Sequence, residues 1–276
     1  MTQDRKTSVK PFFLINKKII YPTIFIGLLL LLWEQASGIG LRAQLFPAPS
    51  TIFRQLITML LPKEGSSILL CHLLASLRRL TVSLIIGSFF GIIFGIASGL
   101  RPYIDALTKP FVSFFLPIPG IALAPIFMIL FGFGDPAIIT AGSLAAFFPV
   151  LFNTSSGIRT VNPTLINAAR IMGATRWQKL VHVYLPWSAI HIFSGFKLGI
   201  SRSWRTVIAV ELVAAADWGL GYMIMQAVEY LQMKVVYVGI FVMALLYLFI
   251  EKALIGFVER RTIYRWGYSP EQGVRQ

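Results

Sequence analysis

The chain has 276 residues, of which 56% are hydrophobic and 13% are charged, and its mean hydropathy is +0.74. These values exclude a soluble globular domain and indicate an integral membrane protein. The formal net charge of +14 does not predict nucleic-acid binding, because the basic residues flank apolar runs and form no basic face. One cysteine and three scattered histidines indicate no disulfide, metal or redox chemistry, so no cofactor is expected.

The first apolar run, residues 19–33, predicts a membrane span. It follows a basic tail at residues 1–18, and it lacks the small-residue cleavage site that would make it a signal peptide. Residues 38–67 are predicted to be external and to carry an amphipathic helix at residues 51–61 that packs on neighbouring spans.

Residues 80–100 predict a second span with a stripe of glycines at four-residue intervals: Gly87, Gly91, Gly95 and Gly99. Such a stripe lets another helix approach to backbone distance, so this span should be central in the bundle. Arg78 and Arg79 fall at its outer end, where basic residues are disfavoured. We interpret them as snorkelling side chains or as the end of an interfacial helix that begins near residue 66.

Two further spans follow a short loop at residues 101–109. Residues 110–134 predict a third span that is kinked by Pro117, Pro119, Gly120 and Pro125. It is interpreted either as a structural helix or as part of the substrate path. Residues 137–158 predict the fourth span, and polar side chains such as Asn153 either bond neighbouring helices, the safer interpretation, or line a polar path.

The stretch 162–186 is the one long polar and basic interval between predicted spans. Asn162 can cap a helix that begins at Pro163 and stops at Gly173. Thr175 and Gln178 have capping-box spacing and predict a second helix, which Pro186 should limit. The pattern predicts a helix-turn-helix elbow, although an ordinary basic loop between two spans would also fit.

The fifth predicted span, residues 187–216, carries ionisable side chains within an apolar frame. At 100° per residue, one face holds Lys197, Ser201, Trp204, Ile208 and Glu211, with Arg205 on its flank and Arg202 pointing away. Ionisable groups at membrane depth face a bundle interior or a wet cavity, so this face should line a pathway or meet a partner subunit. The alternative pairs Glu211 with a basic residue of a neighbouring helix.

The last span is predicted at residues 235–258, followed by a basic tail. Most of the 25 basic residues then lie on the side that holds both termini and the elbow. The positive-inside tendency therefore places the elbow and both termini in the cytoplasm, with six spans in a bacterial inner membrane. The fold class is an all-α membrane bundle, divided into residues 1–66, a core at 67–261 with a loop at 159–186, and a tail at 262–276.

The elbow resembles the EAA loop of permease subunits of ATP-binding-cassette importers. The resemblance rests on Ala168-Ala169, Gly173 and the Leu185-Pro186 end, and it departs from the family at Asn167, where glutamate is usual. The run LPIPGIALAPIFMILFGFG is similar to the third span of the nitrate, sulfonate and taurine branch, and Gly219-Leu220-Gly221 also resembles that family. The core, residues 80–261, should accordingly have the type I importer permease fold.

The resemblance, together with the residues themselves, predicts a role for two sets of residues. The ATPase-coupling set is Asn167, Ala168, Ala169, Gly173, Ala174, Leu185 and Pro186. Ser201, Trp204 and Glu211 lie in the segment that resembles the family's pathway-lining helix. With Pro117, Pro119, Asn153 and Arg205, which the residues themselves suggest, they form the predicted translocation-pathway set. Arg205 is additional to the usual family pattern, and a surplus cation on the pathway would attract an anionic solute.

The resemblance also implies partners. The chain has no phosphate-binding loop with the Gly-x-x-x-x-Gly-Lys-Ser/Thr pattern, so ATP should be bound by a separate ATPase dimer. A second permease copy and an external solute-binding protein complete the expected importer of a small molecule. A membrane receptor or scaffold would also fit the composition. An intramembrane enzyme fits poorly, because its nearest candidate pair, Ser201 and His191, is separated by ~15 Å along one helix.

Overall fold

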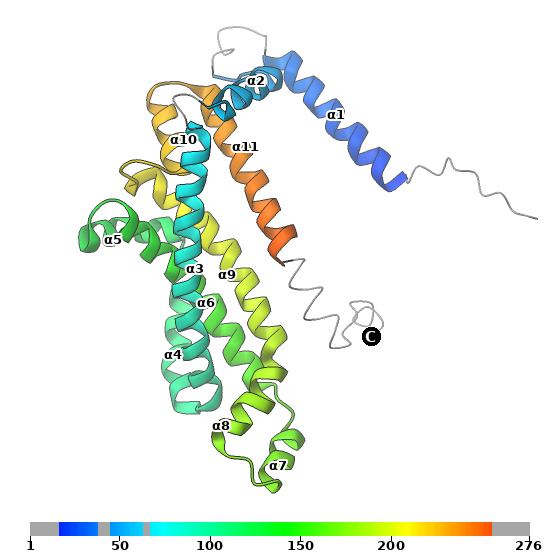
Figure 1. Ribbon diagram of the computed structural model, residues 1–276, viewed down its shortest axis with the longest axis vertical. Coiled ribbons are helices and arrows are strands. Elements are labelled where there is room, and N and C mark those ends of the chain that lie inside the picture. The colour runs from blue at the N-terminus through cyan, green and yellow to red at the C-terminus, as the bar shows by residue number, and fades with distance from the viewer. Residues whose placement is uncertain (1–16, 38–44, 63–66, 256–276) are drawn as a thin grey trace, which may run out of the picture.

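The structure is a computed structural model that describes residues 17–37, 45–62 and 67–255, and the described elements are all helices (Figure 1). Three long helices run together along the long axis of the molecule: α3 (Ile68–Leu100), α6 (Asp135–Arg159) and α9 (Leu185–Ala214). The short helices α7 (Pro163–Ile171) and α8 (Arg176–Lys179) lie at one end, here called the elbow end. The opposite end holds α2 (Pro49–Leu60) and α10 (Leu220–Glu229).

The glycine stripe of α3 brings α6 to backbone distance, as the sequence predicts. A methyl carbon added to Gly95 would lie 2.6 Å from the Cβ of Thr154, and one added to Gly91 would lie 2.8 Å from the Cβ of Val150. These distances are too short for real carbon atoms, so only glycine fits. Close packing of small residues replaces the hydrophobic effect as the force that holds helices together in lipid.

The second span begins earlier than predicted. Helix α3 runs without interruption for 33 residues from Ile68, so Arg78 and Arg79 lie within it and not at its end. Ser67 caps the helix by accepting a hydrogen bond from the Leu70 N–H. The interpretation of the two arginines as the end of a separate helix is wrong. Arg79 also does not snorkel, because its side chain is 4% exposed and forms ion pairs with other helices, as described below, whereas Arg78 is exposed and pairs with Asp135.

The third span is broken and not merely kinked. Helix α4 (Pro102–Phe115) ends before Pro117, and a short turn η1 (Gly120–Leu123) leads into α5 (Ala124–Phe131) at an angle of 99°. Residues 102–109, predicted to be a loop, form the first half of α4. Prolines at 117 and 119 lack the N–H groups that would continue the helix, so the chain turns here.

Side chains of α9 separate two apolar cores. Trp204 and Ile208 pack among α3, α10 and α11 (Met233–Phe249), whereas Val207 and Val210 pack against α5 and α6. Helix α1 (Lys17–Ser37) leans away from this bundle, and it contacts the rest near Trp33, whose ring lies 5.8 Å from that of Tyr237. A π-helical segment η3 (Ile250–Ile255) follows α11.

Four described helices are long and apolar enough to cross a membrane, namely α1, α3, α6 and α11. The bent pair of α4 with η1 and α5 is either a broken fifth span or a re-entrant loop. Helix α9 is long enough at 30 residues, but its ionisable side chains make it less apolar than these. The architecture is the predicted all-α bundle, and the role of α9 as a sixth span stays a prediction. The N-terminal tail, part of the external segment and the predicted span end and tail beyond residue 255 lie outside the described residues.

Candidate functional site

The elbow forms as its sequence predicts. The Asn162 side chain accepts a hydrogen bond of 2.9 Å from the Thr164 N–H at the start of α7. Gly173 has a φ of +74°, and the N–H of Ala174 donates to the Ala169 carbonyl over 3.0 Å. This is the pattern in which a left-handed glycine closes a helix. Thr175 and Gln178 then form both hydrogen bonds of a capping box.

Pro186 does not end the second helix of the elbow, contrary to prediction. Helix α8 passes through a π-helical turn, η2 (Leu180–Tyr184), directly into α9, and Leu185 and Pro186 are the first residues of α9. A proline is tolerated here because its missing N–H falls in the first turn after the π-helical segment. One helical rod therefore runs from the elbow through the full depth of the bundle.

The elbow presents an apolar surface. Ile171 and Met172 are 87% and 85% exposed, and Trp177 is 70% exposed. Beside them lies a groove of about 770 Å³, whose lining includes Ala168, Ala169 and Pro186 of the predicted coupling set. Asn167 is exposed on α7. Exposed apolar side chains clustered at a helix end of this kind mark an interaction surface.

The open face of α9 is the second candidate site. It differs from the face that the sequence favoured, because Trp204 and Glu211 are 2% and 0% exposed and face neighbouring helices. The side chains of α9 that are exposed or half-buried along one side are Ser194, Leu198, Ser201, Arg202, Arg205, Ala209 and Leu212. At 100° per residue, these seven positions fall within one third of the helix circumference. At its edges this face contacts the Tyr247 hydroxyl through Ser201 and the Leu116 carbonyl through Arg202, whereas Arg205 and Leu198 between them are exposed.

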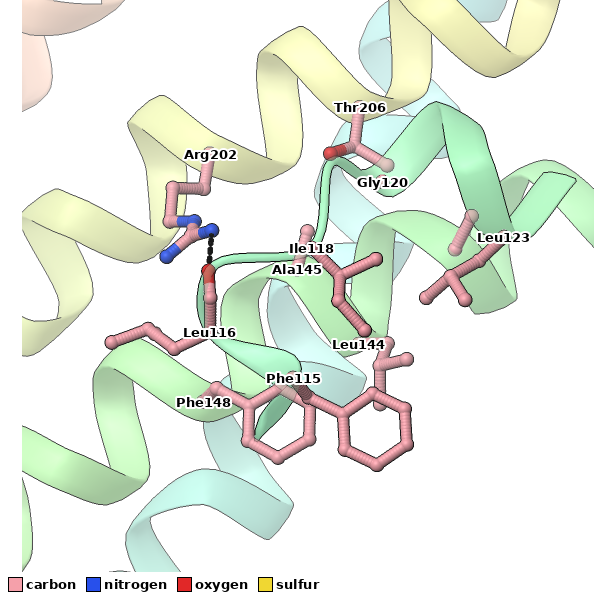
Figure 2. A pocket seen from close by; sticks show the side chains of 11 residues that line it. Phe115, Leu116, Ile118, Gly120, Leu123, Leu144, Ala145, Phe148, Arg202 and Thr206 are labelled. Atoms are coloured by element: carbon pink, nitrogen blue, oxygen red, sulfur yellow. Dashed lines mark hydrogen bonds between the residues drawn. The ribbon is translucent and has the colours of Figure 1, made fainter. Parts of the chain in front are cut away.

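Two guanidinium groups lie on this open face. Arg205 is exposed, and its Nε and Nη2 donate to the carbonyl and hydroxyl of Ser201 on the same helix. Arg202 is half-buried, and its Nη2 donates to the carbonyl of Leu116, at the end of α4 (Figure 2). Among the described residues, neither arginine forms an ion pair.

Arg202 is the functional candidate that the sequence reasoning missed. The helical wheel was centred on Trp204 and Glu211, from which Arg202 points away. The available signal was the spacing of Arg202 and Arg205, since side chains three residues apart lie only about 60° apart on a helix. Which of the two faces is open depends on neighbouring helices, which the wheel does not contain.

Glu211 belongs to a buried polar network near the end of the molecule opposite the elbow (Figure 1). Its carboxylate accepts hydrogen bonds from Arg79 Nη1 at 2.8 Å, from Ser76 Oγ at 2.8 Å and from the Gly221 N–H at 3.0 Å. Arg79 also donates through Nε to Asp135 at 2.7 Å. The structure therefore shows the ion-paired alternative for Glu211, with α3, α6, α9 and α10 joined at one point.

The remaining predicted pathway residues are placed as follows. Pro117 and Pro119 are exposed at the break between α4 and η1. Asn153 donates to the Pro149 carbonyl of its own helix and packs against Gly195 of α9. Ser201 accepts a hydrogen bond from the Tyr247 hydroxyl at 3.0 Å. The break and the open face of α9 thus adjoin, whereas Asn153 lies between helices; the pathway role of this set stays a prediction.

Comparison with known proteins identifies the kind of molecule that carries these features. The chain is 35% identical to the taurine transport system permease protein TauC of Escherichia coli, over 86% of each chain. It is 30% identical to the putative aliphatic sulfonates transport permease protein SsuC of Bacillus subtilis, over 92% of this chain and 89% of that one. An inward-facing structure of the MetNI methionine ABC transporter has the same fold, with a TM-score of 0.57 and 22% identity over 72% of this chain and 95% of that one.

These relatives are transport permeases and not enzymes, which argues against the intramembrane-enzyme alternative. Residues 87–264 match the family described as binding-protein-dependent transport system inner membrane component, and this range contains the elbow, the broken span and all of α9. The chain therefore belongs to this family, and it is a transmembrane permease subunit of an ABC importer.

Proposed function

We propose that this permease carries a small organic anion of the sulfonate class along the open face of α9. The observation that carries the proposal is the pair of arginines on that face, which have no carboxylate partner among the described residues. Counted from Ala214, the end of α9, the two side chains lie about 14–18 Å along the helix axis, at membrane depth. Charged groups at that depth need an anionic partner or water, because burying them in lipid is costly.

A sulfonate fits these two guanidinium groups chemically. Its three oxygens share a permanent negative charge, and guanidinium is the side chain best suited to hold an oxyanion through two parallel hydrogen bonds. The names of two relatives, for taurine and for aliphatic sulfonates, support this solute class. Arg205 is the more exposed of the two and would meet the solute first.

The assembly follows from what the single chain leaves open. Arg205 and Leu198 are exposed on the side of α9 that carries the arginines, so a second copy of the chain would enclose the pathway. The apolar surface around Ile171 and Trp177 is the proposed seat of an ATPase subunit, which binds the ATP. The elbow end would face the cytoplasm with both termini, and an external binding protein would deliver the solute to the opposite end.

The experiment is transport by the complex isolated through a tagged copy of this chain and reconstituted in vesicles. We expect Arg205→Gln to lower ethanesulfonate uptake about tenfold or more, because a hydrogen bond to a charged group contributes about 1.5–3 kcal/mol. Basal ATP hydrolysis should fall much less. Arg54→Gln, which removes an exposed cation from α2, is the matched control and should leave uptake unchanged.

Two outcomes would contradict the proposal. One is unchanged ethanesulfonate uptake by the Arg205→Gln complex. The other is a wild-type complex that transports a neutral or cationic solute and not an anion. Isolation of the chain without any ATP-binding subunit would contradict the proposed assembly.

A further inference from the structure

The break in the third span is attached to α9 at two points one helical turn apart. Arg202 donates to the carbonyl of Leu116, which is the last residue before the break (Figure 2). Thr206 packs against Gly120 so closely that a methyl carbon on this glycine would lie 2.3 Å from the Thr206 hydroxyl oxygen. Residues 202 and 206 lie on one side of α9, so this helix holds both ends of the break.

The Leu116 carbonyl needs a donor. The last carbonyls of any helix lack partners within the helix, and an unsatisfied carbonyl at membrane depth is costly. The break is flanked by Pro117 and Pro119, which have no N–H to offer. The Arg202 guanidinium supplies the donor, and its positive charge also suits the negative end of the α4 dipole.

A carbonyl is nevertheless the weaker of two ligands that Arg202 could hold. A guanidinium and an oxyanion attract each other as opposite charges and can form two parallel hydrogen bonds, whereas a backbone carbonyl is a neutral acceptor. Arg202 is half-buried and lies beside the exposed Arg205 on the open face. An anion held by Arg205 therefore comes within reach of Arg202 and competes with the carbonyl.

The cavity at the break is too small to admit a solute without movement. It has a volume of about 30 Å³, and Leu144, Phe115 and Phe148 line it beneath the break, with the two rings stacked 5.3 Å apart (Figure 2). A space of this size holds about one water molecule. A solute group that enters this cavity must therefore displace the break.

We propose that Arg202 is the residue that reads the solute's anionic group, and that its guanidinium exchanges the Leu116 carbonyl for a solute oxygen. The exchange releases the broken span from α9. This inference rests on the proposed anionic solute, but it assigns the recognition to Arg202 and the first capture to Arg205. The released break is then free to change its angle, so the permease opens for anions and stays closed without one.

The test reports the break directly. In the reconstituted complex, with the native Cys71 changed to serine, Ile118→Cys places a half-buried thiol inside the break. The rate at which N-ethylmaleimide alkylates this thiol is measured with and without ethanesulfonate. Uptake of ethanesulfonate and of propionate is measured in parallel, so that the preference for sulfonate over carboxylate can be compared between variants. Ethanesulfonate should accelerate alkylation in this background by about tenfold, in keeping with one charged hydrogen bond exchanged.

Variants of the two arginines then separate the hydrogen bond from Arg202 to the Leu116 carbonyl from the first binding of the anion by Arg205. Arg202→Gln should alkylate fast without ethanesulfonate, respond no further to it, and transport it about tenfold or more slowly. Arg205→Gln should keep the slow basal alkylation and need more ethanesulfonate to accelerate it. Arg202→Lys keeps the charge but not the planar pair of donors, so its uptake ratio of ethanesulfonate to propionate should fall. Arg202→Lys tests the role of Arg202 even if the Arg202→Gln complex does not assemble.

The outcomes distinguish the two proposals. If Arg202→Gln or Arg202→Lys keeps slow basal alkylation, normal acceleration and normal solute preference while Arg205→Gln loses uptake, the role of Arg202 is wrong and the anion pathway stands. If the wild-type complex carries a neutral solute and ethanesulfonate accelerates nothing, the anion pathway itself is wrong.

Discussion

Replacing Glu211 with alanine should destabilise the protein more than any change to an exposed charge. Glu211 is fully buried, and its loss leaves the Arg79 guanidinium, only 4% exposed, without one of its two carboxylates. Breaking a buried ion pair from one side costs about 3–5 kcal/mol. Because Arg79 keeps its 2.7 Å bond to Asp135, we expect about 3–4 kcal/mol.

The control uses the neighbouring arginine. Arg78 also pairs with Asp135, but its side chain is 64% exposed. Exposed ion pairs contribute about 0–1 kcal/mol, so Arg78→Ala should change stability by less than about 1 kcal/mol. Glu211→Ala removes the carboxylate that pairs with Arg79, and Arg78→Ala removes the residue next to Arg79 on α3. The two altered ion pairs differ chiefly in burial.

Glu211→Gln separates charge from hydrogen bonding. Its amide oxygen can still accept from Arg79, and its amide nitrogen would donate towards Ser76 Oγ, which already accepts the Leu220 N–H at 2.9 Å. The expected loss is therefore intermediate between those of Glu211→Ala and Arg78→Ala. This order should hold because only the negative charge and one acceptor are removed.

The assay is reversible unfolding of the purified chain in detergent micelles by guanidinium chloride. Tryptophan fluorescence is a suitable signal, since the ring of Trp218 lies 4.9 Å from that of His72 beside the network. Equal free energies of unfolding for Glu211→Ala and Arg78→Ala would refute the reasoning. A larger loss for Arg78→Ala would show that the network is held from its exposed side.

Two other predictions concern glycines. Gly95→Ala should lower the free energy of unfolding by about 1–3 kcal/mol, because its methyl carbon would lie 2.6 Å from Thr154 Cβ. Gly27 has nothing within 4 Å, so Gly27→Ala should leave the free energy of unfolding unchanged. Equal losses for the two variants in the same micelle assay would contradict this. Gly173→Val should lower the solute carried per ATP hydrolysed while leaving the complex inserted, since valine resists the φ of +74° at the elbow. Gly173→Asn should preserve this ratio, and normal coupling by the valine variant would exclude the elbow as the coupler.

The caps and the turn of the elbow could be predicted because their determinants are local, whereas the continuation of the second helix through Pro186 was not predicted. The Asn162 cap, the left-handed Gly173 and the box between Thr175 and Gln178 each involve residues at most five apart. Local hydrogen bonds are encoded by spacing alone. The glycine stripe of α3 was predictable for the same reason, since a period of four residues fixes one helix face.

Features that depend on distant residues were not predictable. Arg79 meets Glu211 across 132 positions of sequence, and no pattern within α3 indicates that partner. The helical wheel of α9 gave the angular positions of its polar residues but could not say which side its neighbours cover, and it therefore grouped Ser201 with the buried Glu211 and not with Arg202. The face of Trp204 and Glu211 is the covered one, and the face of Arg205 is open. Proline predicts a distorted third span, but the angle of 99° is set by where α5 packs against α6 and α9.

The continuity of α9 gives the two proposed sites one mechanical element. The helical backbone runs from Arg176 to Ala214, interrupted only by the π-helical turn η2. Along this continuous helix, Arg202 lies about 39 Å from Arg176, the first residue of α8. A movement that an ATPase imposes at the elbow would reach the hydrogen bond between Arg202 and the Leu116 carbonyl without crossing a helix interface. In the same way, an anion that releases the Leu116 carbonyl alters what α9 holds at the break. The turn η2, followed directly by Pro186, is the place where this rod can change its angle, because helices kink at π-helical turns and at prolines.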